Sequence, residues 1–103
     1  MGQTITEWID TCHGVAKEKG FWENERNVGE MLMLITSELG EAIEAHRTGL
    51  HGLHAKDTFE DELADTAIRL FDMCGGLGIN LEEQIEWKMN FNKSREVKHG
   101  KSY

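Results

Sequence analysis

Apolar residues recur every three to four positions along most of the chain, which is the spacing of one face of an α-helix. The pattern covers residues 5–19, 28–47, about 57–76 and a stretch from 81 that fades near 97–100. The second stretch has the clearest apolar stripe, formed by Val28, Met31, Leu32, Ile35, Leu39, Ala42 and Ile43. Because no stretch alternates like a β-strand, the pattern predicts an all-α chain.

Each predicted helix opens with a capping residue that is followed three positions later by Glu. The expected pairs are Thr4 and Glu7, Asn27 and Glu30, Asp57 and Glu60, and Asn80 and Glu83. We expect Gly20 to end the first helix and Gly75-Gly76 to end the third. Residues 48–56 contain Gly49 and Gly52 and are predicted to form a turn-rich linker.

The chain of 103 residues fits a single domain spanning residues 1–103, with one modest core. It contains no proline, so its turns rely on glycine and asparagine. Three long amphipathic helices and a shorter first one are most simply packed as a four-helix bundle.

Charge and hydropathy narrow the class of protein. A formal net charge of −8 argues against binding to a nucleic acid polymer, which requires a basic surface. No apolar run approaches the roughly 20 residues that cross a membrane, and the first residues lack the features of a signal peptide. We therefore expect a cytoplasmic protein with no membrane partner. Cys12 and Cys74 lie in apolar helical patterns and are expected to be buried, reduced thiols.

Two acidic pairs stand out because each falls beside the apolar stripe of a predicted helix. The first is Glu38-Leu-Gly-Glu41 and the second is Glu62-Leu-Ala-Asp65; side chains three positions apart in a helix are neighbours. If the two helices face each other, the four carboxylates meet and repel unless cations or protons lie between them. Oxygen donors alone favour Mg²⁺, with Mn²⁺ as an alternative, over zinc. The sequence therefore predicts a metal site at these four residues.

A simpler interpretation is a solvated acidic face, because the same spacing occurs elsewhere in the chain. The other pairs are Glu7 and Asp10, Glu41 and Glu44, Asp57 and Glu60, and Glu83 and Glu86. A di-iron bundle would need two Glu-x-x-His motifs, and only Glu96-Val-Lys-His99 has that form. His51 and His54 lie in the glycine-containing linker and are interpreted as loop residues.

In their order along the chain, these motifs resemble the MazG-like, all-α nucleoside triphosphate pyrophosphohydrolases. The family signature is ExxE, a spacer and ExxD, and here 20 residues separate Glu41 from Glu62. The segments 17–27 and 88–95, the latter of the form K-x-x-x-N-x-x-R, add to the resemblance, as does the ending His99-Gly-Lys101. The resemblance covers nearly the whole chain.

The resemblance implies a Mg²⁺-dependent hydrolase that converts a nucleoside or deoxynucleoside triphosphate to the monophosphate and pyrophosphate, in nucleotide-pool cleansing. Glu38 and Glu41 would serve as catalytic residues as well as metal ligands. Five further residues are implied in substrate binding: Lys88, Asn92, Arg95, Trp22 and His13. The first three lie on one face of the fourth predicted helix and suit phosphate oxygens. Arg26 is interpreted as a surface charge.

Two positions depart from the family pattern. Ser37 replaces an acid found in members with a doubled glutamate, and Arg69 replaces a tyrosine found in some dCTP-selective members, so neither the number of metal ions nor the base preference transfers. Because a small four-helix unit leaves apolar faces uncovered, and because family members are dimers or dimers of dimers, we expect a homodimer or homotetramer. The alternative function is a catalytically silent helical module that binds a nucleotide or a protein.

Overall fold

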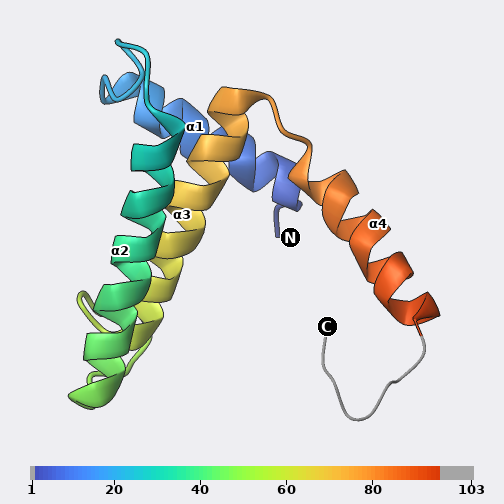
Figure 1. Ribbon diagram of the computed structural model, residues 1–103. Coiled ribbons are helices and arrows are strands. Elements are labelled where there is room, and N and C mark those ends of the chain that lie inside the picture. The colour runs from blue at the N-terminus through green and yellow to red at the C-terminus, as the bar shows by residue number, and fades with distance from the viewer. Residues whose placement is uncertain (1, 96–103) are drawn as a thin grey trace.

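The computed structural model describes residues 2–95 and contains four helices in this range (Figure 1). They are α1 (Ile5–Glu18), α2 (Val28–Arg47), α3 (Phe59–Leu77) and α4 (Leu81–Ser94). Over the same residues there is no strand. The predicted all-α, four-helix fold class is therefore confirmed. The last helix ends at Ser94, before the expected fading near residues 97–100, and Arg95 follows it with an extended backbone.

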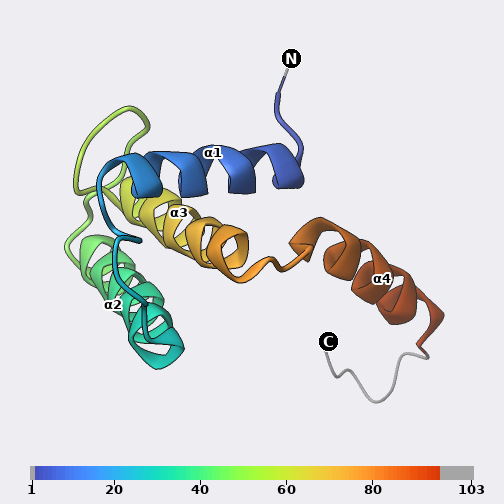
Figure 2. The same ribbon diagram turned by 90° about the horizontal axis from the view of Figure 1, so that it is seen from above.

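The helices α2 and α3 lie side by side and antiparallel, and α1 crosses α3 (Figures 1 and 2). The fourth helix contacts α1, where the backbone N–H of Thr6 donates to Oε1 of Glu82 at 2.9 Å, and otherwise points away from α2 and α3. The core between α1, α2 and α3 is small. Its buried apolar side chains are Ile9, Cys12, Ala16, Met31, Ala42, Ala45, Met73 and Cys74.

Three of the four predicted helix caps are confirmed. Thr4 and Glu7 form a capping box at α1, Asn27 caps α2, and Asn80 caps α4 by accepting from the backbone N–H of Glu83. The predicted cap of the third helix is wrong by one residue: Thr58 caps α3 by accepting from the N–H of Asp61.

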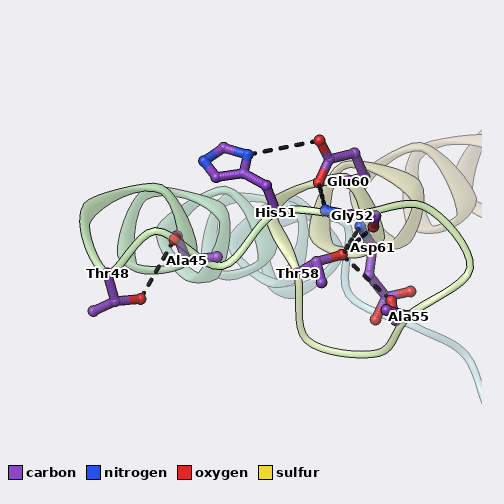
Figure 3. Close-up of polar contacts among 8 residues, drawn as sticks. All are labelled: Ala45, Thr48, His51, Gly52, Ala55, Thr58, Glu60 and Asp61. Carbon is purple, nitrogen blue, oxygen red and sulfur yellow. Dashed lines mark hydrogen bonds and ion pairs between the residues drawn. The ribbon is translucent and has the colours of Figure 1, made fainter.

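The segment between α2 and α3 explains that difference (Figure 3). Asp57 has a φ of +65°, and its backbone N–H donates to the Asp61 carboxylate, so it turns the chain before the helix instead of capping it. The Thr58 hydroxyl donates to the carbonyl of Gly52 at 2.9 Å, while Glu60 accepts from the N–H of Gly52 at 2.8 Å. These bonds fix the linker against the first turn of α3.

The predicted end of the third helix is also wrong. Helix α3 continues through Gly75 and Gly76 to Leu77 and ends at Gly78, whose φ of +69° is the left-handed conformation that glycine adopts readily. The two earlier glycines serve packing instead. A Cβ at Gly75 would lie 2.6 Å from the Cβ of His13, so the glycine permits close approach of α1 and α3.

Other expectations from the sequence can be compared with this fold. Cys12 and Cys74 are buried free thiols, and burial raises the pKa of each, as predicted for unreactive core cysteines. His51 lies in the linker with its Nδ1 3.6 Å from Glu60 Oε2, in agreement with its interpretation as a loop residue. Of the helices within residues 2–95, none combines the length and apolar character required to cross a bilayer.

Candidate metal centre

A stripe of polar side chains runs along the face of α3 that packs against the other helices. Glu62, Asp65, Arg69 and Asp72 are separated by three, four and three positions, which places them above one another on one side of the helix. Glu62 and Asp72 are buried and Asp65 is half-buried. In a helix that only supported the fold, apolar residues would occupy such inward positions, so the stripe marks a candidate site.

The structure brings three of the four predicted ligands together. Carboxylate oxygens of Glu38 from α2 and of Glu62 and Asp65 from α3 lie within 4.8 Å of one another. We refer to these three residues as the carboxylate trio. Mg²⁺ holds oxygens at about 2.1 Å, so two oxygens on one ion lie roughly 3 to 4 Å apart. The trio therefore fits a single divalent cation after small side-chain movements.

Glu41 does not belong to this trio. It lies one turn beyond Glu38 on α2 and its side chain is exposed, but its charge contributes to the raised pKa of Glu62. Glu41 is therefore near the carboxylate trio without converging on it.

The electrostatics of Glu62 reflect this crowding. Burial is the largest cause that raises its pKa, followed by its hydrogen bond with Asp65 and by the charges of Asp65, Glu38 and Glu41. The position of Glu62 in the first turn of α3 has the opposite effect, because the positive end of the helix dipole favours a carboxylate there. A divalent cation at this point would relieve the repulsion.

A cavity of about 500 Å³ adjoins the carboxylate trio. Glu38 and Asp65 form part of its wall, as do the side chains of Arg26 and Arg69. The rest is mainly apolar and includes Trp8, Cys12, Val15, Ala16, Phe21 and Ile68. Small-molecule sites commonly have volumes of about 300 to 1,000 Å³ and combine apolar walls with a few polar groups, and this cavity has both properties.

Asp72 organises a second polar group beside the cavity, which we call the Asp72 cluster: His13, Trp22, Arg26 and Asp72. Oδ1 of Asp72 accepts from Nε1 of Trp22 at 2.8 Å and lies 2.9 Å from Nδ1 of His13, while Oδ2 lies 3.3 Å from Arg26. The Arg26 guanidinium also stacks over the Trp22 ring at 5.0 Å. These contacts tie α1 and the segment after it to α3.

This cluster determines how the predicted nucleotide contacts His13 and Trp22 are placed. Nδ1 of His13 and Nε1 of Trp22 both face Asp72, and neither residue lines the 500 Å³ cavity. Trp22 also packs against Gly76. Both side chains contact Asp72, which itself lines the cavity, so they support its wall through that carboxylate.

The predicted phosphate-binding residues on α4 lie apart from the carboxylate trio of the same chain. Lys88 and Arg95 both approach the Phe91 ring, at 5.1 and 5.8 Å, which places the two cations on one side of the helix. Asn92 is buried, and its Oδ1 has no hydrogen-bond partner among residues 2–95. We call Lys88, Asn92 and Arg95 the donor row. In this chain α4 packs on α1, and the donor row is not among the residues that line the cavity.

Sequence reasoning missed three residues of this region. Arg26 was expected at the surface, yet its side chain is 20% exposed and pairs with Asp72. Asp72 itself is a carboxylate between Phe71 and the buried Met73, and this interruption of an apolar run was the available signal. In the sequence Arg69 is only a departure from a family pattern, whereas in the structure its Nε lies 3.5 Å from Oε1 of Glu38.

Comparisons of the chain with protein-family models, with curated proteins and with solved structures find no match.

Proposed function

We propose that this protein is a cytoplasmic, Mg²⁺-dependent hydrolase that converts a nucleoside or deoxynucleoside triphosphate to the monophosphate and pyrophosphate, and that it acts in nucleotide-pool cleansing. The observation that carries the proposal is the convergence of Glu38, Glu62 and Asp65 from two helices at the edge of a cavity of ligand size. The resemblance of the ExxE and ExxD motifs to MazG-like pyrophosphohydrolases supplies the reaction.

The geometry suggests a division of roles among the carboxylates. Glu38, Glu62 and Asp65 would hold the cation, since their oxygens already converge. When bound, Mg²⁺ would neutralise phosphate charge and acidify the attacking water. Glu41 is exposed just outside the trio, where it suits a base that accepts the water proton, and it would also be the fourth ligand if the side chain turns inward.

The reaction balances with these groups. The water oxygen bonds to the α-phosphorus, the bond from that phosphorus to the bridging oxygen of the β-phosphate breaks, and pyrophosphate leaves with the bond electrons. One proton of the water passes to Glu41, and the other stays on the oxygen that joins the monophosphate. The apolar wall of the cavity would take the nucleoside and exclude bulk water, which strengthens the electrostatic interactions at the phosphates.

A homodimer or homotetramer belongs to the same proposal. Val28, Leu32, Leu39 and Ile43 form a stripe on α2 that remains 44 to 61% exposed in one chain. The radius of gyration is 16.1 Å, against roughly 13 Å for a compact domain of this length, because α4 extends away from the other helices. A second copy would cover these apolar surfaces and bring its own donor row to the carboxylate trio.

The direct test is incubation with a panel of standard, deoxy and damaged nucleoside triphosphates, with Mg²⁺ and with chelator, followed by separation of the products. We expect at least one triphosphate to give the monophosphate and pyrophosphate only with Mg²⁺. Binding of nucleotides without turnover would favour the catalytically silent module instead. Release of orthophosphate and a diphosphate would show a different reaction.

A further inference from the structure

Arg69 is a cation set within the acidic stripe of α3. It lies four positions after Asp65 and three before Asp72, so it shares their face of the helix. Its Nε lies 3.5 Å from Oε1 of Glu38 on α2. One arginine thus reaches across the α2–α3 interface to a member of the carboxylate trio.

This contact and a divalent cation make competing demands on Glu38. An arginine side chain stays protonated throughout the physiological pH range, so Arg69 offsets part of the repulsion among the three carboxylates whenever no metal is bound. The same positive charge reduces the attraction that the trio exerts on a divalent ion. A metal that binds to Glu38 must therefore displace Arg69 or tolerate it nearby.

Arg69 is held loosely in comparison with the other arginine of the cavity wall. Its side chain is 42% exposed and its contact with Glu38 is longer than the roughly 2.7 to 2.9 Å of a strong charge-assisted hydrogen bond. Arg26 is 20% exposed and is bound by Asp72 and stacked on Trp22. Both guanidinium groups line the cavity. Arg26 donates a hydrogen bond to Asp72, whereas Arg69 can turn into the cavity without breaking such a bond.

We propose that Arg69 is a built-in counter-cation that occupies Glu38 in the metal-free protein and turns to a phosphate of the substrate when metal and triphosphate bind. The inference rests on the proposed function and adds its regulation. A metal on Glu38 releases Arg69 for the phosphate, and a phosphate draws Arg69 away from Glu38. Metal and triphosphate therefore strengthen each other's binding, and this coupling is reciprocal.

The test is calorimetric titration of the full chain with Mn²⁺ alone. Two neutral variants, Arg69→Gln and Arg69→Met, should bind Mn²⁺ about fivefold more tightly than the wild type, because the competing charge is gone. Arg69→Lys retains the charge and should stay close to the wild type. Arg47→Gln is the matched control, because Arg47 is 74% exposed and pairs with Glu44 on its own helix. In the same neutral variants, the KM for the triphosphate should rise.

The outcomes separate this inference from the function on which it rests. Equal or weaker Mn²⁺ binding by both neutral variants, with circular dichroism unchanged, would overturn the role of Arg69; the metal site itself would stand if Glu62→Gln weakened Mn²⁺ binding. If neither the wild type nor any variant bound Mn²⁺, both proposals would fail. Tighter binding in the neutral variants, but not in Arg69→Lys or Arg47→Gln, supports the inference.

Discussion

Glu62 combines burial in the α2–α3 interface with three neighbouring carboxylates, and both effects raise its pKa above the ordinary value of 4.5. A group whose pKa is higher in the folded state binds its proton more tightly there than in the unfolded chain. Its favourable contribution to stability is therefore fully present below the unfolded pKa and is lost as the pH rises through the folded pKa. Once ionised, the Glu62 carboxylate therefore destabilises the metal-free protein.

Replacement of Glu62 by Gln tests this directly. We expect the metal-free Gln variant to match the wild-type Tm below the ordinary pKa of 4.5 and to exceed it increasingly as the pH rises through the raised pKa of Glu62, because the ionised carboxylate is the destabilising form. At 100 times its Kd, Mg²⁺ should stabilise the wild type by about 2.7 kcal/mol and so raise its Tm. It should raise the Tm of the variant less. Activity should fall roughly 100-fold or more. Thermal melts in chelator and in Mg²⁺ give the comparison.

Glu44→Gln is the control for this experiment, because Glu44 lies on α2 but pairs with Arg47 outside the trio. Its Mg²⁺ response should equal that of the wild type. A large loss of metal-free stability in Glu62→Gln at neutral pH, or an unchanged Mg²⁺ response, would mean that Glu62 is a structural partner instead of a ligand.

At the scale of the helices, close packing of α1 on α3 depends on the absence of a side chain at Gly75. The Cβ of an alanine there would lie 2.6 Å from the Cβ of His13 and 3.3 Å from a methyl group of Ile9. A contact this short between the Cβ atoms of two packed helices is relieved only if the helices move apart. That movement would disturb the Asp72 cluster, which joins the same two helices.

We therefore expect Gly75→Ala to destabilise the protein by about 1 to 3 kcal/mol, although alanine favours helix formation by roughly 1 kcal/mol. Gly14→Ala is the matched control, because Gly14 lies inside α1 with no atom within 4 Å of the added Cβ. That variant should be more stable than the wild type by about 0.5 to 1 kcal/mol. Urea unfolding of the wild type and the two variants measures these changes in the free energy of unfolding. If Gly75→Ala stabilised the protein, the close packing of α1 on α3 would be contradicted.

The helix bounds and caps show which features of the fold the sequence could predict. Local rules identified four helices, the capping residues Thr4, Asn27 and Asn80, and the ExxE and ExxD pairs, because these patterns depend on spacing within one helix. The end assigned at Gly75-Gly76 was wrong because glycine ends some helices and permits close packing in others.

The contacts of Asp72 and Arg69 could not be predicted in the same way. Asp72 binds residues 46 to 59 positions away in the chain, and Arg69 reaches Glu38 on another helix. Such contacts depend on the crossing of α1, α2 and α3, which helical periodicity does not determine. The periodicity of α2 predicts one apolar stripe. In the structure Met31 and Ala42 of that stripe are buried, whereas four of its other members remain exposed in a single chain: Val28, Leu32, Leu39 and Ile43.

At the scale of the whole molecule, the position of α4 is the feature that a second copy would explain. The donor row carries cations that suit a triphosphate, but it lies along and just after α4, a helix that packs on α1. If each site combines the carboxylate trio of one chain with the donor row of another, two inactive variants can restore each other.

Mixing Glu62→Gln with the double variant Lys88→Ala/Arg95→Ala tests this arrangement. Each protein should be nearly inactive alone, whereas subunit exchange in a dimer should restore activity at roughly a quarter of the sites. A mixture of Glu62→Gln with Asp65→Asn is the control and should stay inactive, since both changes lie on α3. No recovery in the first mixture, despite exchange shown by native mass spectrometry, would exclude a site shared in this way.

The central claim is that the carboxylate site activates water for attack on the α-phosphorus. Turnover in ¹⁸O-labelled water, with the triphosphate that the panel identifies, tests this most directly. Mass spectrometry of the products should find one ¹⁸O in the nucleoside monophosphate and none in pyrophosphate, and Glu62→Gln should suppress both products together. Label in pyrophosphate, label in released orthophosphate, or no turnover of any triphosphate with Mg²⁺ would contradict the account.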